Sequence, residues 1–130
     1  MSLSTVRLGM VGLGGWGKNV VRSFGSANGC ELAYLCDNSP QTLDKPSRLY
    51  PGARATNDYN ELLADKTVDA VAIVTPAPMH YGMAKQALLA GKHVYVEKPM
   101  TLTSEHAEEL VETADRQGLK LMVGHLLEYH

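Results

Sequence analysis

Cysteine is scarce in this sequence: 130 residues contain two, Cys30 and Cys36, and both lie in one apolar stretch, CELAYLC. If that stretch is a strand, the two residues are roughly 20 Å apart, because each residue advances about 3.3 Å. A disulfide requires Cα atoms closer than about 7 Å, so these cysteines do not pair with each other. No Cys-x-x-Cys pair or Cys/His cluster is present, so we expect two reduced, buried thiols and no metal site.

A charge excess of one sign and long apolar runs are also lacking. The 12 Lys and Arg residues against 14 Asp and Glu leave a formal net charge of -2, without the basic footprint of a nucleic-acid-binding protein. The longest apolar runs, such as residues 68–74, are too short to span a bilayer, and the N-terminus lacks a signal-peptide pattern. We therefore expect a cytoplasmic protein that binds small molecules, and neither nucleic acid nor a membrane.

The composition is that of one globular domain, with 45% hydrophobic and 20% charged residues. Apolar segments typical of strands alternate along the chain with segments of helical periodicity. The expected strands are 6–11, 31–36, 53–56, 68–74, 93–97 and 119–123. This alternation predicts an α/β fold: a doubly wound, mostly parallel sheet of the Rossmann type, with about six strands and helices on both faces.

Two of the expected helices depend on individual residues. In residues 38–51, Pro40 suits the first turn of a helix, but Pro46 predicts that the helix is short or broken. Thr103 or Ser104 is expected to cap a helix near the C-terminus. The apolar spacing of that helix predicts a buried stripe of Ala107, Leu110, Val111 and Ala114.

The segment Val6 to Gly17, VRLGMVGLGGWG, runs from a strand into glycines spaced as G-x-G-x-x-G. In a dinucleotide-binding loop, Gly12 permits the tight turn, Gly14 lets the pyrophosphate approach the backbone, and Gly17 lets the next helix pack closely. The residues expected to bind the cofactor at that helix N-terminus are Gly12, Leu13, Gly14, Gly15, Trp16 and Gly17. The motif alone is also compatible with a purely structural turn.

Asp37 follows the second expected strand, 37 − 17 = 20 residues after Gly17. A carboxylate at this spacing accepts hydrogen bonds from the adenosine ribose and repels a 2′-phosphate, so NAD is expected and NADP is less favoured. The alternative is that Asp37 caps the turn before Pro40. Because the carboxyl ends of parallel strands meet at one edge, the segments 75–78 and 97–99 are expected to line that edge with Asp37.

Five segments carry a further signal: GLGGWG, CDNSP, VTPAPMH, AGKHVYVEKPMTLT and LMVGHLLEYH. With these segments the chain, from Val6 onward, resembles the nucleotide-binding domain of the glucose-fructose oxidoreductase, inositol dehydrogenase and MocA (Gfo/Idh/MocA) family. Members of that family oxidise or reduce a hydroxyl of sugars, cyclitols or nucleotide sugars with NAD or NADP. The resemblance therefore implies an NAD-dependent dehydrogenase that acts on a sugar-like molecule.

The resemblance also implies roles for residues beyond the glycine loop. Thr75, Pro76 and His80 would border the nicotinamide half of the cofactor, and Glu97 would hold the nicotinamide side of the pocket. Lys98 would be catalytic: its ammonium would touch the reacting hydroxyl, stabilise the developing alkoxide and relay its proton. From the residues alone, Glu97 and Lys98 are also compatible with a surface ion pair, and His80 with a polar residue in the first turn of a helix.

In the family, a second α+β domain completes the substrate pocket. The resemblance therefore implies that residues 1–130 are the dinucleotide-binding domain, without that second domain, and that they bind NAD without efficient turnover. The full-length protein is expected to be a homo-oligomer. Two alternatives stay open: a non-catalytic NAD(H)-sensing regulatory module, and the cofactor domain of an amino-acid pathway reductase. Lys98 favours the enzyme over the sensor, and the Glu-Lys-Pro segment disfavours the reductase.

Overall fold

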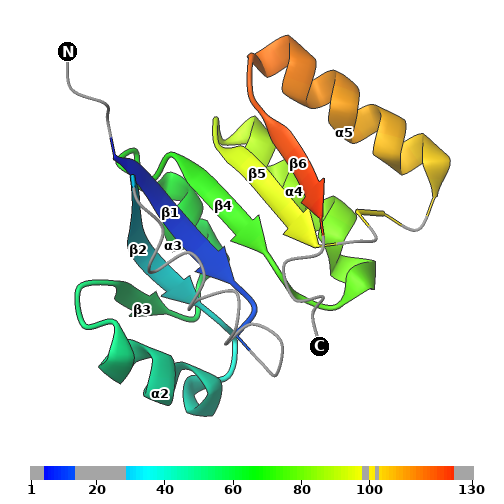
Figure 1. Cartoon of the computed structure of the whole chain (residues 1–130). Helices are drawn as coiled ribbons and strands as arrows, with labels where there is room; N and C mark the ends of the chain where they lie inside the picture. The colour runs from blue at the N-terminus through cyan, green and yellow to red at the C-terminus, as the bar shows by residue number, and fades with distance from the viewer. Residues whose placement is uncertain (1–4, 14–28, 98–99, 102, 125–130) are drawn as a thin grey trace.

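A computed structural model describes residues 5–13, 29–97, 100–101 and 103–124 of the chain (Figure 1). In these residues, six strands form one sheet in the order β3-β2-β1-β4-β5-β6, and every neighbouring pair is parallel. The strands are β1 (Val6–Val11), β2 (Cys30–Cys36), β3 (Arg54–Thr56), β4 (Ala70–Ile73), β5 (His93–Glu97) and β6 (Leu121–Gly124). The chain thus winds outward from β1 in both directions, which confirms the expected doubly wound sheet.

Helices cover both faces of this sheet. The helices in the described residues are α2 (Pro40–Leu49), α3 (Tyr59–Ala64), the 3-10 turn η1 (Ala77–Met79), α4 (His80–Leu89) and α5 (Ser104–Gln117). On one face, Leu43 of α2 packs with Leu8 and Leu35 of the sheet. On the opposite face, α3, α4 and α5 each contribute one fully buried leucine to a common cluster: Leu62, Leu88 and Leu110.

The strand β4 is the most deeply buried part of the sheet. Val71, Ala72 and Ile73 are each 0% exposed, because β4 lies between β1 and β5 and is covered on both faces. A run of small and β-branched apolar residues is what a doubly covered parallel strand requires. The central position predicted for this segment is confirmed, and it places the residues after β4 beside those after β1.

The helix interruption predicted at Pro46 does not occur, since α2 is continuous from Pro40 to Leu49. Ser39 caps its start by accepting the Thr42 N–H, and Pro40 occupies the first turn as expected. Pro46 lacks a backbone donor, but its ring is buried. The apolar burial offsets the lost hydrogen bond. Of the short or broken helix that the sequence predicts, the ten-residue α2 contradicts only the break. The prediction of a break weighs the local cost of Pro46 without its tertiary contact.

The buried stripe of α5 differs from the prediction at two positions, since Ala107 is only partly buried and Val111 is exposed. Leu110 and Ala114 are buried as expected. Val111 is 47% exposed, however, and Thr113 is buried in its place. The Thr113 hydroxyl donates to the carbonyl of Glu109 at 2.8 Å, so its burial leaves no unpaired hydroxyl. A polar residue can therefore enter the core when the helix backbone supplies its partner.

Both cysteines are free, which confirms that they do not form a disulfide. Cys36 is buried, but Cys30 is only partly so, and the expectation of two buried thiols is wrong for Cys30. The reason is its place: Cys30 begins β2 opposite Val6, which is itself 42% exposed.

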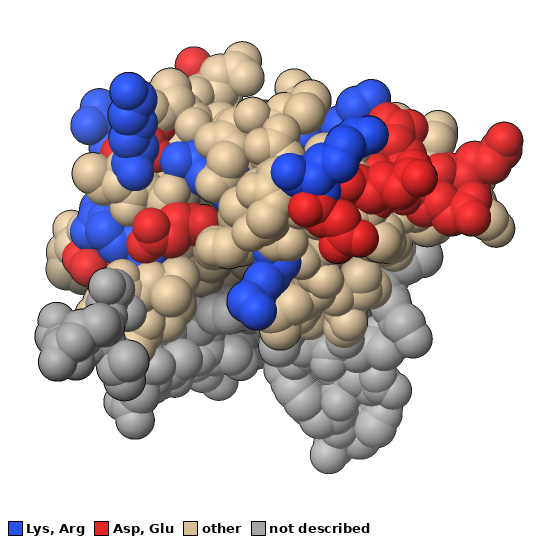
Figure 2. Space-filling view, turned by 90° about the horizontal axis from the view of Figure 1, so that it is seen from above, with Lys and Arg blue, Asp and Glu red and all other residues tan. Residues whose placement is uncertain are grey.

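Charges of both signs are interspersed on the face shown in Figure 2, and acidic side chains gather there over α5. The exposed acidic residues of that helix are Glu105, Glu108, Glu112 and Asp115. Among the residues that the structure describes, no helix is both long and apolar enough to cross a bilayer.

Candidate cofactor-binding site

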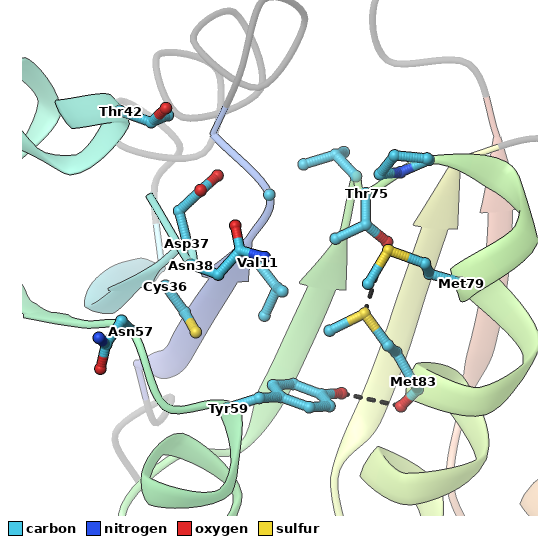
Figure 3. A pocket seen from close by; sticks show the side chains of 13 residues that line it. Val11, Cys36, Asp37, Asn38, Thr42, Asn57, Tyr59, Thr75, Met79 and Met83 are labelled. Atoms are coloured by element: carbon cyan, nitrogen blue, oxygen red, sulfur yellow. Dashed lines mark hydrogen bonds between the residues drawn. The ribbon is translucent and has the colours of Figure 1, made fainter. Parts of the chain in front are cut away.

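The strand order reverses between β1 and β4, because the chain leaves β3 at one edge and re-enters the sheet beside β1. In open α/β sheets, ligands bind beyond the carboxyl ends of the strands at this point. A cavity of about 640 Å³ lies there (Figure 3), within the range of small-molecule sites. The described residues that line it are Val11, Gly12, Cys36, Asp37, Asn38, Thr42, Asn57, Tyr59, Val74, Thr75, Pro76, Met79 and Met83.

Gly12 forms the turn out of β1, as predicted. Its φ is +91°, a conformation that L side chains rarely adopt, and its N–H donates to the carbonyl of Cys36 at 2.9 Å. A Cβ on Gly12 would stand 2.8 Å from the backbone nitrogen of Thr75. Only glycine fits at this point, where the segment after β1 lies against the segment after β4. The backbone itself therefore forms this part of the cavity wall.

Asp37 lies at the carboxyl end of β2 and lines the cavity. One carboxylate oxygen, Oδ2, accepts the N–H of Leu13 at 2.7 Å, and Oδ1 accepts the N–H of Ser39 at 2.9 Å. The bond to Ser39 is the turn-capping contact considered from the sequence, and the bond to Leu13 ties the carboxylate to the glycine loop. Asp37 thus joins the two segments that border this side of the cavity.

The floor of the cavity is largely apolar. In Figure 3, Asp37 and Thr75 lie on opposite sides, and Tyr59 lies across the bottom. The Tyr59 hydroxyl donates to the carbonyl of Met83 at 2.8 Å, which links α3 to α4. Burial raises the pKa of Tyr59. Burial, with the nearby Asp37 carboxylate as a further cause, raises the pKa of the Cys36 thiol to about 11. Both groups therefore stay protonated and act as walls rather than nucleophiles.

The turn after β4 supplies the opposite wall. Thr75 and Pro76 line the cavity, as the resemblance implies. His80 does not line it: it is 2% exposed, and its Nε2–H donates to the carbonyl oxygen of Thr75 at 2.5 Å. Glu97 is partly buried at the carboxyl end of β5, outside the lining. The structure thus unites Gly12, Asp37, Thr75 and Pro76 in one cavity and sets His80 behind its wall.

Several expected site residues lie outside the described part of the chain: Gly14, Gly15, Trp16, Gly17 and Lys98. Leu13 is described and 1% exposed, and its N–H is held by Asp37. The lining residues that the sequence interpretation missed are Val11, Cys36, Asn38, Thr42, Asn57, Tyr59, Val74, Met79 and Met83. A signal existed for Asn57 and Tyr59, because they follow the brief strand β3 and so reach the same edge as Asp37.

These residues fit a dinucleotide. Gly12 leaves a cradle that a Cβ would fill, and the Asp37 carboxylate faces the cavity beside it. A metal is a poorer match, since no group of three or more His, Cys, Asp or Glu in the described residues could hold one. The fold and the site together define the class of this chain: a nucleotide-binding domain of the Rossmann type.

Comparison with known proteins gives the family. Residues 6–125 match GFO_IDH_MocA, described as an oxidoreductase family with an NAD-binding Rossmann fold. The chain belongs to this family, and it is an NAD(P)-binding oxidoreductase domain. It is 33% identical over 122 residues to a glycosyl hydrolase family 109 protein of Shewanella amazonensis. The match covers 87% of this chain and 27% of the relative. The chain thus spans about a quarter of the length of the curated relatives it matches.

Solved structures agree on the fold and differ in the cofactor they contain. GenD2 from gentamicin A biosynthesis, in complex with NAD, is 31% identical with a TM-score of 0.88 and covers 93% of this chain and 34% of its own. KijD10, a 3-ketoreductase from Actinomadura kijaniata in complex with NADP and TDP-benzene, is 28% identical with a TM-score of 0.87. The match covers 92% of this chain and 37% of KijD10. Relatives of one fold thus bind either dinucleotide, so the choice depends on particular side chains.

Proposed function

We propose that this chain is the cofactor-binding domain of an NAD-dependent oxidoreductase that transfers hydride between nicotinamide and a hydroxyl of a sugar, cyclitol or nucleotide sugar. The observation that carries the proposal is the Asp37 carboxylate, which lines the cavity beside the Gly12 turn. The family and the names of two similar proteins, a 3-ketoreductase and a scyllo-inositol dehydrogenase, support a carbonyl or hydroxyl substrate.

The preference for NAD follows from charge. Each oxygen of Asp37 already accepts one backbone N–H, and a carboxylate oxygen has a further lone pair for a ribose hydroxyl. A 2′-phosphate at the same place would meet the negative charge directly. No Lys or Arg is among the described residues that line the cavity, so none of them offsets this repulsion.

The remaining roles are divided among the residues of the site. A nicotinamide ring supplies hydride transfer when it is bound. Gly12 leaves room for the cofactor backbone, and Thr75 and Pro76 shape the opposite wall. When the hydroxyl is oxidised, Lys98 accepts its proton as a neutral amine, and the ammonium so formed stabilises the developing alkoxide by a hydrogen bond. In the reverse direction the ammonium returns that proton to the oxygen.

The test is calorimetric titration of the wild-type chain and Asp37→Ala with NADH and, separately, NADPH. We expect the wild type to bind NADH more tightly, and Asp37→Ala to weaken NADH binding about tenfold or more while the two affinities approach each other. Asp44→Ala is the matched control, since Asp44 is exposed on α2 and paired with Arg48. An unchanged ratio of the two affinities in Asp37→Ala would count against the assignment.

A second candidate function is cleavage of a glycosidic bond, and the names of the glycosyl hydrolase family 109 relatives favour it. Some glycoside hydrolases depend on NAD, which this fold would bind. The two candidates differ in their products. With an aryl glycoside and NAD, a hydrolase releases the phenol without net NADH, whereas a dehydrogenase forms one NADH per sugar oxidised. The assay is done with the whole natural protein that contains this sequence.

A further inference from the structure

His80 is a polar residue in an unusual place. It is the first residue of α4 and only 2% exposed. A buried polar side chain is normally held by hydrogen bonds, and the ring of His80 bonds to the carbonyl oxygen of Thr75, five residues earlier, at 2.5 Å. Because a carbonyl oxygen only accepts, the hydrogen must reside on Nε2. The imidazole therefore reaches back and holds the end of the preceding loop.

The loop between β4 and α4 is poor in donors of its own. Pro76 and Pro78 have no backbone N–H, and η1 begins without a side-chain cap. Thr75 lies just beyond β4, where the ladder with β5 ends at Ile73. The imidazole of His80 supplies a hydrogen-bond donor to the Thr75 carbonyl at this point.

The position of Thr75 matters because Gly12 lies against it. A Cβ on Gly12 would be 2.8 Å from the Thr75 nitrogen and 2.9 Å from its Cγ2. The Thr75 hydroxyl also donates to the sulfur of Met83 at 3.5 Å. A shift of Thr75 by a few tenths of an ångström would therefore move the wall of the cavity against the glycine turn.

We propose that His80 is a positioning residue: it fixes Thr75 against Gly12 and so shapes the wall that faces the nicotinamide half of the cofactor, without touching the cofactor. This role differs from the direct contact that the family resemblance implies, since His80 stands behind the cavity lining. The proposal rests on the proposed function, because it assumes that the Thr75 side of the cavity receives the nicotinamide half.

The experiment compares two ligands and two variants. NADH contains both halves of the cofactor, and ADP-ribose lacks the nicotinamide. We expect His80→Leu to weaken NADH binding about tenfold and to leave ADP-ribose binding within about twofold of wild type. His80→Gln, whose amide N–H can reach the place of Nε2, should recover most of the NADH affinity. The control is His93→Leu, since His93 lies at the start of β5 and accepts the N–H of Lys120.

Two outcomes overturn the proposal. Equal loss of both ligands in His80→Leu, in step with a lower melting temperature, would show a merely structural histidine. Unchanged binding of both ligands would remove any role. A wild-type chain that binds neither ligand would refute the proposed function itself, and the positioning role with it.

A measurement on the wild type keeps the proposal testable if His80→Leu does not fold. Nitrogen-15 NMR of the imidazole distinguishes the two tautomers. We expect the hydrogen of His80 on Nε2, with slow exchange against solvent because the ring is buried. A hydrogen on Nδ1 alone would contradict the bond to Thr75 and overturn the assignment.

Discussion

Polar side chains at the amino ends of the parallel strands and those at the carboxyl ends have opposite roles. We call these two ends of the sheet the amino edge and the carboxyl edge. At the amino edge, Lys92 is 4% exposed, and its ammonium donates to the carbonyls of Asp65 and Val68 at 2.7 and 2.8 Å. The Asp65 carboxylate accepts the hydroxyls of Tyr34 and Thr67. At this edge the chain supplies the partners of its own buried charge.

At the carboxyl edge, polar groups line an open cavity instead. The Asp37 carboxylate orders the backbone on either side of it and still faces the cavity, together with Asn38, Thr42 and Asn57. Groups of this kind have bonding capacity left for a ligand, which a closed network such as that of Lys92 and Asp65 does not offer.

The comparison teaches that a shifted pKa does not by itself locate the site in this molecule. Hydrogen bonds from Thr67 and Tyr34 lower the pKa of Asp65 to about 2, and burial lowers the pKa of Lys92. Both groups lie away from the cavity, whereas Cys36 and Tyr59, whose pKa values are raised, line it. Shifted pKa values therefore occur at both places. Perturbed groups often mark functional sites, but here the cavity and the glycine turn mark it.

The most direct test of the difference between the two edges is to add the same methyl group at each of them. Gly12 and Gly29 both have positive φ, +91° and +78°. A Cβ on Gly12 would clash with Thr75, whereas a Cβ on Gly29 would meet none of the described residues within 4 Å. We expect Gly12→Ala to lower the free energy of unfolding by about 3 kcal/mol and to abolish measurable NADH binding, because backbone strain and overpacking add.

Gly29→Ala is the matched control, with the backbone strain alone. It should lower the free energy of unfolding by about 1 to 2 kcal/mol and leave NADH affinity within about twofold of wild type. Urea unfolding and calorimetric titration measure the two effects. If both variants bind NADH equally well, the close contact of Gly12 with Thr75 has no part in the cofactor site.

The reverse experiment disturbs the amino edge. Lys92→Met removes the donor to the carbonyls of Asp65 and Val68, and we expect the free energy of unfolding to fall by about 2 kcal/mol while NADH affinity is retained. Lys85→Met is the control: that ammonium pairs with Glu109 on the surface at 2.6 Å, so a smaller loss is expected. A Lys92→Met chain that folds normally but loses NADH would show that the two edges are coupled.

Much of the fold could be predicted from local pattern. β5 spans His93–Glu97 as the sequence predicts, and Thr103, one of the two predicted caps, begins α5 by accepting the N–H of His106. Apolar periodicity, glycines and capping residues act over a few positions, so they are visible in one sequence. The errors at Pro46 and Val111 have the opposite origin, because each depends on what another element places against the helix.

The site divides in the same way. The spacing from Gly17 to Asp37 predicts a dinucleotide site. Gly12 and Asp37 follow neighbouring parallel strands, which indicates where the cavity lies. The floor of the cavity cannot be predicted from such spacing. Tyr59 and Met83 are 24 positions apart in the chain, and the Tyr59 hydroxyl reaches the Met83 carbonyl because α3 and α4 pack on one face of the sheet. The bond from His80 to Thr75 is equally hidden, because a histidine in the first turn of a helix reads as exposed.

The smallest effect expected is the acid response of the amino edge, which tests whether its network stabilises the fold at all. The pKa of Asp65 is about 2 in the folded chain, against an ordinary value of 3.8. Between these values the folded state binds fewer protons than the unfolded state, so the stabilisation is full above about pH 4 and is lost as the pH falls toward 2.

Other carboxylates titrate in the same range, so the informative quantity is the difference between variants. The urea midpoint of Asp65→Asn should therefore decline less steeply over this range than that of wild type, while Asp44→Asn, a change at an exposed surface pair, should follow the wild-type curve. Parallel curves for wild type and Asp65→Asn would mean that the hydrogen bonds from Tyr34 and Thr67 contribute no pH-dependent stability, and that the closed network is geometry without energetic consequence.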